Sequence, residues 1–438
     1  MPEMTNLDRE DLRRLHPADV ADRLQRLPVE EVQGILPQLP PELAARALGE
    51  LEHDRQCELL RMLLPENLAP LLFHLPPKVV ADLLPALPPG ARRSTLESLP
   101  REQRQRVQML LRYAPDTAGG IMSDRFIALR EDMMVGEARE LIGRQAEAMP
   151  SEDVSYLYVT DAAQRLRGIV SLRDLVFRRP ERRMREFMNR EVTVVRVTDD
   201  QETVARQFEH YHYLGLPVLD GEGRLVGVVK ASDALEVAQA EATEDMQLMV
   251  GLSGEERALT PWRSAVRLRL PWLYVNLATA FLAASVVGMF EGAIARWTAL
   301  AVFLPIIAGQ GGNAGMQTLT VIVRDLALGE LSPGDGRRAL AKELMLGLIN
   351  GLAVGLVVGL VGWFWKGSWV LGAVGCAALV LNQLSAAFAG VAIPFGLKAL
   401  RVDPALASSI FVTTVTDVAG FFFFLGLGVL AMRWFGVG

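Results

Sequence analysis

The sequence predicts a multidomain membrane protein, in which a soluble N-terminal part is followed by a five-helix transmembrane domain. Its 45 basic and 51 acidic residues are unevenly divided, because only 16 of them lie in 270–438. That last part contains successive apolar windows, each long enough to cross a bilayer as a helix, at 270–290, 297–323, 344–365, 367–397 and 404–432. Two internal repeats divide the soluble part. We expect a helical superhelix over 1–118, a tandem α/β pair over 119–235, a connecting helix over 236–262 and the transmembrane domain over 263–438.

The first repeat is short and helical. A Leu-Pro pair recurs about every twelve residues from Leu27-Pro28 to Leu99-Pro100, with Leu51-Glu52 at one repeat position. Segments such as ADVADRL and ELAARAL have apolar residues at helical spacing, and proline suits the first turn of a helix. Stacked units of this kind share one core. They indicate docking or regulation, and no catalysis.

The second repeat is longer and mixes strands with helices. YLYVTDAAQRLRGIVSLRDL at 156–175 returns as GLPVLDGEGRLVGVVKASDAL at 215–235. Asp161 and Gly168 recur as Asp220 and Gly227, 59 residues later. Each copy is typical of a strand, a tight turn, a second strand and a helix with a Ser or Asp cap.

These two copies resemble the paired cystathionine-β-synthase (CBS) domains, which commonly bind adenine nucleotides in the cleft between the repeats. The resemblance implies ATP as a regulatory ligand. Tyr156 and Tyr213 would contact the base, Asp174 the ribose hydroxyls and Arg173 the phosphates. The alternative is a purely structural pair.

An acidic segment joins the tandem pair to the membrane. Residues 236–250 have helical character, and Glu236, Glu241, Glu244 and Asp245 make this segment densely charged. Such a run is often only a solvated helix face. Because this helix leads to the membrane surface, it can also carry a signal there.

Basic residues orient the membrane helices. With the N-terminus inside, nine Lys and Arg lie in or beside the cytoplasmic loops and three on the other side. We therefore expect a multi-pass protein of the cytoplasmic (inner) membrane with cytoplasmic N-terminal domains. Small residues in the third window, GLINGLAVGLVVGLVG, predict close helix packing.

The second window is unusual because glycines and amides interrupt it. LPIIAGQGGNAGMQTLT at 304–320 has low helix propensity, and irregular backbone at membrane depth occurs only inside protein or beside water. Two interpretations remain open. The segment forms a pore wall that presents backbone carbonyls and amide oxygens, or its glycines let two helices approach closely.

Asp417 is the only charged residue between Asp403 and Arg433. A carboxylate near the middle of a membrane span costs about 2.5–3.5 kcal/mol or more to desolvate, so it should face a helix bundle or a water-filled path. It indicates a cation pathway, with an interhelical polar contact or a proton relay as alternatives.

Several other classes of protein are excluded. A net charge of −6 without a basic face argues against nucleic-acid binding. The two cysteines are too far apart in sequence to indicate a disulfide framework, and no signal peptide opens the chain. All five histidines lie in the soluble part, so an intramembrane H-E-x-x-H metalloprotease is excluded. A chloride channel would carry its CBS pair after more spans. The protein is therefore not expected to be an enzyme.

The whole chain resembles the MgtE family of magnesium channels. The resemblance rests on YAPDTAGGIMS (113–123), EATEDM (241–246), GQGGNAGMQT (309–318) and VDPALASSIFVTTVTDVAG (402–420), in this order. It implies a homodimer in the lipid bilayer, with a Mg²⁺ pore on the twofold axis between the second and fifth spans. It also implies a gate that intracellular Mg²⁺ closes by bridging acidic surfaces of the soluble domains.

The resemblance also assigns residues. Asp417 would form the ion site with its copy in the partner, and Asp403 and Glu343 are further acids near the cytoplasmic side, although Asp403 also suits a helix cap. The implied pore-lining residues are Gly311, Gly312, Asn313, Gln317 and Thr416. The implied regulatory Mg²⁺ ligands are Asp82, Asp233, Glu236, Glu241, Glu244 and Asp245.

The helical domain departs from this pattern. Lys78 and Arg46 stand where the resemblance leads us to expect acids, which puts the N-terminal share of the sensor in doubt. The closest rival functions are transport of another divalent cation, such as Co²⁺ or Mn²⁺, and coupled cation exchange.

Overall fold

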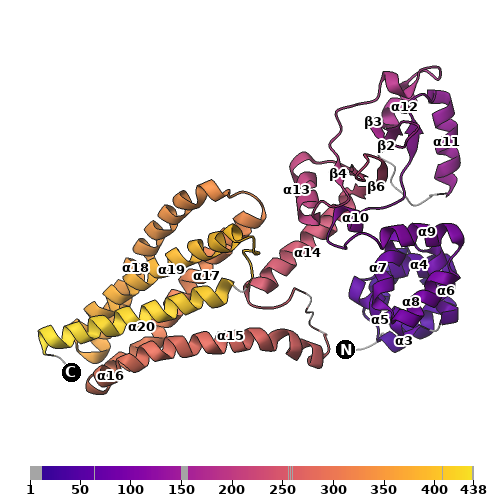
Figure 1. Ribbon diagram of the computed structural model, residues 1–438. Helices are drawn as coiled ribbons and strands as arrows, with labels where there is room; N and C mark the ends of the chain where they lie inside the picture. The colour runs from indigo at the N-terminus through magenta and orange to yellow at the C-terminus, as the bar shows by residue number, and fades with distance from the viewer. Residues whose placement is uncertain are drawn as a thin grey trace. The chain divides into compact units, whose positions relative to one another are not determined.

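The computed structural model describes residues 12–63, 65–148, 156–254, 256, 258, 260–406 and 408–436. It forms two compact units, at 1–238 and 239–438 (Figure 1). Leu64 of the Leu-Pro repeat and the first eleven residues of the predicted helical domain lie outside the described residues. The predicted fold class is confirmed: a helical N-terminal domain, a tandem CBS pair and five long apolar C-terminal helices.

The N-terminal domain is a stack of short helices. They are α2 (Pro17–Gln25), α3 (Val29–Ile35), η1 (Leu36–Gln38), α4 (Pro41–Gly49), α5 (His53–Met62), α6 (Pro65–His74), α7 (Pro77–Leu83), η2 (Leu84–Ala86), α8 (Pro89–Ser98) and α9 (Arg101–Leu110). Each helix packs against the helix two places further along the chain, which is the geometry of a superhelix.

The Leu-Pro pairs explain this periodicity. At Leu-Pro pairs such as 27–28 and 75–76, the proline ends an extended link, and its carbonyl accepts the first hydrogen bond of the next helix, from Val32 N to Pro28 O and from Val80 N to Pro76 O. The leucine before it is buried, as Leu27 and Leu75 are. Each such pair therefore provides a buried leucine for the core and a proline at which the next helix begins.

The CBS pair contains two three-stranded sheets of the same topology. The first repeat has β1 (Ala128–Arg130), α11 (Val135–Ala148), β2 (Tyr156–Thr160), β3 (Leu166–Ser171), α12 (Leu172–Phe177) and η3 (Met184–Glu186). The second has β4 (Val195–Arg196), α13 (Gln201–Tyr211), β5 (Gly215–Leu219), β6 (Leu225–Lys230) and the start of α14 (Ala231–Met249); α10 (Ala118–Ile121) precedes both. In each sheet the first two strands are parallel and the last two antiparallel.

The repeated residues fill equivalent places. Asp161 and Asp220 each close the turn between two strands by accepting backbone N–H groups, from Arg165 and from Arg224. A Cβ added at Gly227 would lie 2.4 Å from Met122 Sδ, so a larger residue at this strand position would have to displace the buried Met122 side chain. One apolar cluster extends from the helical domain into the second repeat, where it includes Val218.

The second unit contains the membrane helices. They are α15 (Trp262–Met289), α17 (Ala299–Ala327), α18 (Gly336–Lys366), α19 (Trp369–Ala399) and α20 (Ser408–Phe435), with the short α16 (Glu291–Arg296) and η4 (Pro333–Asp335) between them. The long helices run side by side (Figure 1).

Glycines bring α18 and α19 into backbone contact, as predicted. A Cβ added at Gly351 would lie 2.8 Å from Val380 Cα, and one added at Gly359 would lie 2.9 Å from Gly372 O. The small residues of the third window therefore serve helix packing.

One expectation about the second span is wrong. The segment 304–320 is part of a continuous α-helix, α17, and forms no irregular backbone stretch. Its backbone carbonyls therefore accept hydrogen bonds within the helix. A backbone group left without a hydrogen bond in the membrane would cost several kcal/mol, about 4–8 kcal/mol on the water-to-cyclohexane scale.

Candidate functional site

Asp417 lies in α20, one helix turn before Gly420, and its side chain is half-buried. Among the described residues its carboxylate has no hydrogen-bond or ion-pair partner. The neighbouring Thr416 is buried, and its hydroxyl donates to Thr413 O at 3.0 Å. A carboxylate without a protein partner in a membrane helix is suited to a hydrated cation.

The facing helix α17 has two different sides. Asn313 and Gln317, one helix turn apart, are exposed on the surface of the chain. Gly315 lies on the buried side, where an added Cβ would be 2.5 Å from Val412 of α20. Gly312 is half-buried and lies opposite Thr413. Of the residues expected to line a pore, Asn313 and Gln317 are the ones on an open face.

Gly311 and Thr416 are buried inside helix contacts. The pore-lining role expected for these two residues stays a prediction. Gly311 faces α19, where an added Cβ would be 2.2 Å from the Asn382 amide nitrogen. Both therefore belong to the packing behind the open face of α17.

Two residues that the sequence analysis missed hold α17 in place. Asn382 of α19 is fully buried, and its side-chain nitrogen donates to Ile307 O at 2.9 Å. The adjacent Gln383 donates to Gln310 O at 3.4 Å. Gly420 of α20 also packs closely against Asn382, because a Cβ added at Gly420 would lie 2.6 Å from the Asn382 amide nitrogen. The sequence did contain a sign of this contact, because two consecutive amide residues interrupt the fourth apolar window.

Asn382 is thus the point at which α17, α19 and α20 meet. Because Gly420 is one turn from Asp417, this contact sets where the acid stands relative to α17.

Glu343 and Asp403 have defined protein partners. Glu343 of α18 is buried, accepts a hydrogen bond from Thr318 Oγ1 at 2.9 Å and lies 3.0 Å from Lys342 Nζ. Asp403 is exposed and accepts from Ala405 N at 2.7 Å. Glu343 therefore links α18 to α17, and Asp403 makes the cap-like contact that was the alternative for it.

The acids expected at the sensor surface lie in both units. Asp82 of α7 is paired with Lys78, whose Nζ lies 2.5 Å from its Oδ2. Asp233, at the start of α14, accepts weakly from Lys230 N at 3.4 Å. Burial raises the pKa of Asp233, while the backbone contact and the charges of Lys230 and Lys78 lower it. Glu236 is exposed.

The remaining expected sensor acids follow along α14. Glu244 is exposed, and Glu241 and Asp245 are half-exposed; each has polar interactions within the chain. Among the residues that the structure describes, no three His, Cys, Asp or Glu side chains gather closely enough to hold a metal ion. The assignment of these acids as regulatory Mg²⁺ ligands therefore stays a prediction. A Mg²⁺ ion at these acids would need ligands from more than one surface of the protein.

An ion pair between the buried Glu256 and the exposed Arg269 ties the end of the connecting segment to the first span. Glu256 is buried, and its carboxylate accepts from Arg269 Nε at 2.8 and 2.9 Å, with a further contact from Nη2. Gln247 of α14 donates to Glu256 O at 3.0 Å. The sequence showed these charges but not their pairing.

The nucleotide candidates separate into two places. Tyr156 pairs across the sheet with Ser171, and Ser171 Oγ donates to Asp174 Oδ2 at 2.7 Å. Arg173 is exposed beside Asp174. Tyr213 belongs to the second repeat, where its hydroxyl lies 2.7 Å from Thr193 Oγ1 and its ring stacks on Tyr211.

The fold and these sites define a polytopic membrane protein of the ion-transporter class with an appended CBS pair. Family models match in the same order: a divalent cation transporter at 304–427, the MgtE intracellular N domain at 15–116, and CBS domains at 118–181 and 184–240. The chain belongs to the MgtE family, which is a family of transporters and not of enzymes.

Three relatives illustrate the similarity. The magnesium transporter MgtE of Thermus thermophilus is 38% identical over 336 residues, 75% of this chain and 73% of that protein. The magnesium transporter MgtE of Enterococcus faecalis is 33% identical over 334 residues, 76% of this chain and 73% of that protein. A crystal structure of the cytosolic domain of the Mg²⁺ channel MgtE in complex with ATP has 38% identity and covers 52% of this chain and 93% of that one, with a TM-score of 0.49.

Proposed function

We propose that this protein transports Mg²⁺ across the cytoplasmic membrane as a selective, passive channel, with Asp417 at its ion site. The observation that carries the proposal is the half-buried carboxylate of Asp417, which has no partner among the described residues although it lies in a membrane helix. Membership of a family whose curated relatives are named magnesium transporters supports Mg²⁺ as the cargo. Magnesium keeps its octahedral water shell tightly, so an acid with space around it suits the hydrated ion.

A homodimer explains the open face of α17. Asn313 and Gln317 are exposed on a membrane helix, where polar groups belong inside protein or beside water. A second copy would enclose them and bring two Asp417 carboxylates to one axis. Because like charges repel, a divalent cation between them would stabilise the pair. Inward flow would be driven by the membrane potential, with the N-terminal domains in the cytoplasm.

Closure by intracellular Mg²⁺ is the second part of the proposal. At high Mg²⁺, ions would bridge acids of α7, the CBS pair and α14, and at low Mg²⁺ these acids would repel. The Lys78–Asp82 pair weakens the share of the helical domain, because the only expected acid of α7 is already neutralised.

ATP is the proposed regulatory ligand of the CBS pair. Tyr156 pairs across the sheet with Ser171, whose hydroxyl donates to Asp174, and the exposed Arg173 is the chain neighbour of Asp174; these links support a shared site in the first repeat. Tyr213 would contact the nucleotide from the second repeat, and its hydroxyl is already hydrogen-bonded to Thr193.

Flux measurements in proteoliposomes test the transport proposal and its rivals. We expect a membrane potential, negative inside, to drive Mg²⁺ entry that internal Mg²⁺ suppresses. Co²⁺, Mn²⁺ and Ca²⁺ would compete only weakly. Strong transport of Co²⁺ or Mn²⁺ would favour the other divalent specificity. Uptake that requires an opposing proton or sodium gradient would replace the channel with an exchanger.

A further inference from the structure

A cleft of about 790 Å³ opens between the helical domain and the CBS pair inside the first unit. The helical domain lines it with Phe73, Arg106 and Met109, and the segment 124–126 lines the other side. Its volume falls in the range of small-molecule sites, about 300–1,000 Å³. It shares no lining residue with the nucleotide candidates around Asp174.

A buried carboxylate organises the charged part of this cleft. The Asp124 side chain is only 6% exposed, and its Oδ1 has no hydrogen-bond partner among the described residues. Its Oδ2 lies 3.5 Å from Arg106 Nη1. Burial raises the pKa of Asp124, and the charges of Arg106 and Arg125 lower it. A buried, incompletely paired acid is costly, so its presence needs a reason beyond stability.

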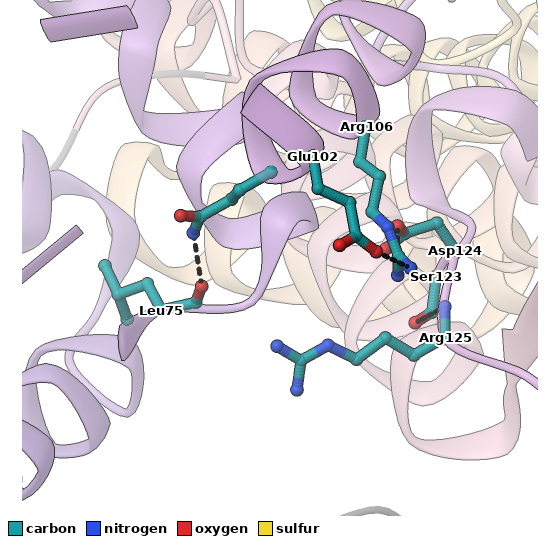
Figure 2. A network of polar contacts seen from close by, with 7 residues as sticks. Leu75, Glu102, Arg106, Ser123, Asp124 and Arg125 are labelled. Atoms are coloured by element: carbon teal, nitrogen blue, oxygen red, sulfur yellow. Dashed lines mark hydrogen bonds and ion pairs between the residues drawn. The ribbon is translucent and has the colours of Figure 1, made fainter. Parts of the chain in front are cut away.

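Asp124 and Glu102 hold the Arg106 guanidinium at the cleft. Arg106 Nη2 donates to Glu102 Oε1 at 2.8 Å, and Figure 2 shows Arg106 between these two acids. A guanidinium has five N–H donors, and these contacts use two of them. The Arg106 side chain is 45% exposed, so the other donors can reach a ligand in the cleft. Arg125 extends beside them (Figure 2).

The rest of the wall is apolar and aromatic. Phe73 is 54% exposed, which is unusual for a phenyl group and marks an open apolar surface. Phe126 packs edge-on against Tyr158 with ring centroids 6.2 Å apart, so its position is fixed. Gln103 does not contribute a donor to a ligand, because the two N–H groups of its side-chain amide donate to Leu72 O at 2.9 Å and to Leu75 O at 3.1 Å.

We propose that this cleft binds a phosphorylated planar heterocycle of nucleotide size, with its phosphate on Arg106 and its ring against Phe73. Arginine forks match phosphate oxygens bidentately, and exposed aromatic rings stack on heterocycles. Asp124 acts as a positioning residue, since it holds the arginine and does not touch the ligand.

Calorimetric titration of the full-length protein with AMP and GMP tests this site. The protein carries Asp174→Asn throughout, so that the nucleotide site proposed for the CBS pair does not contribute. We expect one of these nucleotides to bind this protein. Phe73→Ala, which removes the stacking contact, and Arg106→Gln, which removes a charge-assisted contact, should each weaken binding about tenfold or more. Arg93→Gln, which breaks a surface pair with Glu97, is the matched control and should change nothing.

Phe73→Ala keeps the test decisive if Arg106→Gln fails to fold, because the phenyl group is largely exposed. The absence of nucleotide binding, equal losses in Arg93→Gln, or equally tight binding of inorganic phosphate alone would each overturn the proposal. Failure here leaves the ATP proposal for the CBS pair untouched, because that site is tested by ATP binding with Asp174 intact.

Discussion

Gly311→Ala should destabilise the membrane domain strongly although it adds one methyl group. The added Cβ would lie 2.2 Å from the Asn382 amide nitrogen and 2.8 Å from its Cγ, far inside van der Waals contact. Either α17 moves away from α19, or Asn382 rotates and loses its bond to Ile307 O. Overpacking costs about 1–3 kcal/mol, and an unsatisfied buried amide costs a similar amount, about 1–3 kcal/mol. Because either response alone relieves the clash, we expect a loss of about 1–3 kcal/mol in the free energy of unfolding.

Unfolding by sodium dodecyl sulfate in mixed micelles measures this loss. Gly309→Ala is the matched control, because it lies in the same helix and has nothing within 4 Å of its Cβ position. It should be neutral or slightly stabilising, since alanine favours helix by about 1 kcal/mol over glycine. Asn382→Ala added to Gly311→Ala should recover part of the stability by making room. If Gly311→Ala is as stable as Gly309→Ala, the proposed meeting point of the helices is wrong.

Three further substitutions test the soluble domains and their link to the membrane. Lys78→Asp should add an acid to α7 and thereby lower the internal Mg²⁺ concentration at which flux is halved. A titration of flux against internal Mg²⁺ measures this concentration, and an unchanged value would show that α7 is not part of the sensor. Because burial raises the pKa of Asp124 in the folded state, stability should fall as pH rises from about 4 through that raised value. Asp124→Asn should flatten this dependence in thermal unfolding measured from about pH 4 to about pH 7, and an unaltered slope would contradict it. Arg269→Gln leaves the buried Glu256 carboxylate without its partner and should lower thermal stability more than Arg263→Gln on the exposed start of the same helix; equal effects would count against the ion pair as a structural link.

The periodic features of this protein could be predicted from the sequence. The Leu-Pro spacing, the repeated Asp161 and Asp220 turns and the long apolar windows each repeat a local rule that holds regardless of distant partners. The lone charge of Asp417 could be found in the same way, because its surroundings in the sequence are entirely apolar.

Contacts between helices could not be predicted in this way. The glycines at 309–315 suggested irregular backbone, yet the bilayer enforces intrahelical hydrogen bonds, and glycine serves close packing instead. The role of Gly311 depends on Asn382, which lies 71 positions later in the chain. The bond from Thr318 to Glu343 likewise depends on how α17 and α18 pack.

The most direct test of transport through Asp417 is Mg²⁺ uptake by proteoliposomes that contain Asp417→Asn. This substitution keeps the shape of the side chain and removes its charge. Glu291→Gln removes an exposed carboxylate of α16 in the same domain and is the matched control. We predict that Asp417→Asn abolishes potential-driven uptake or reduces it at least about tenfold, the size of a lost charge contact of 1.4 kcal/mol, while Glu291→Gln retains it. Uptake by Asp417→Asn at the rate of the unaltered protein would contradict the assignment of the ion site.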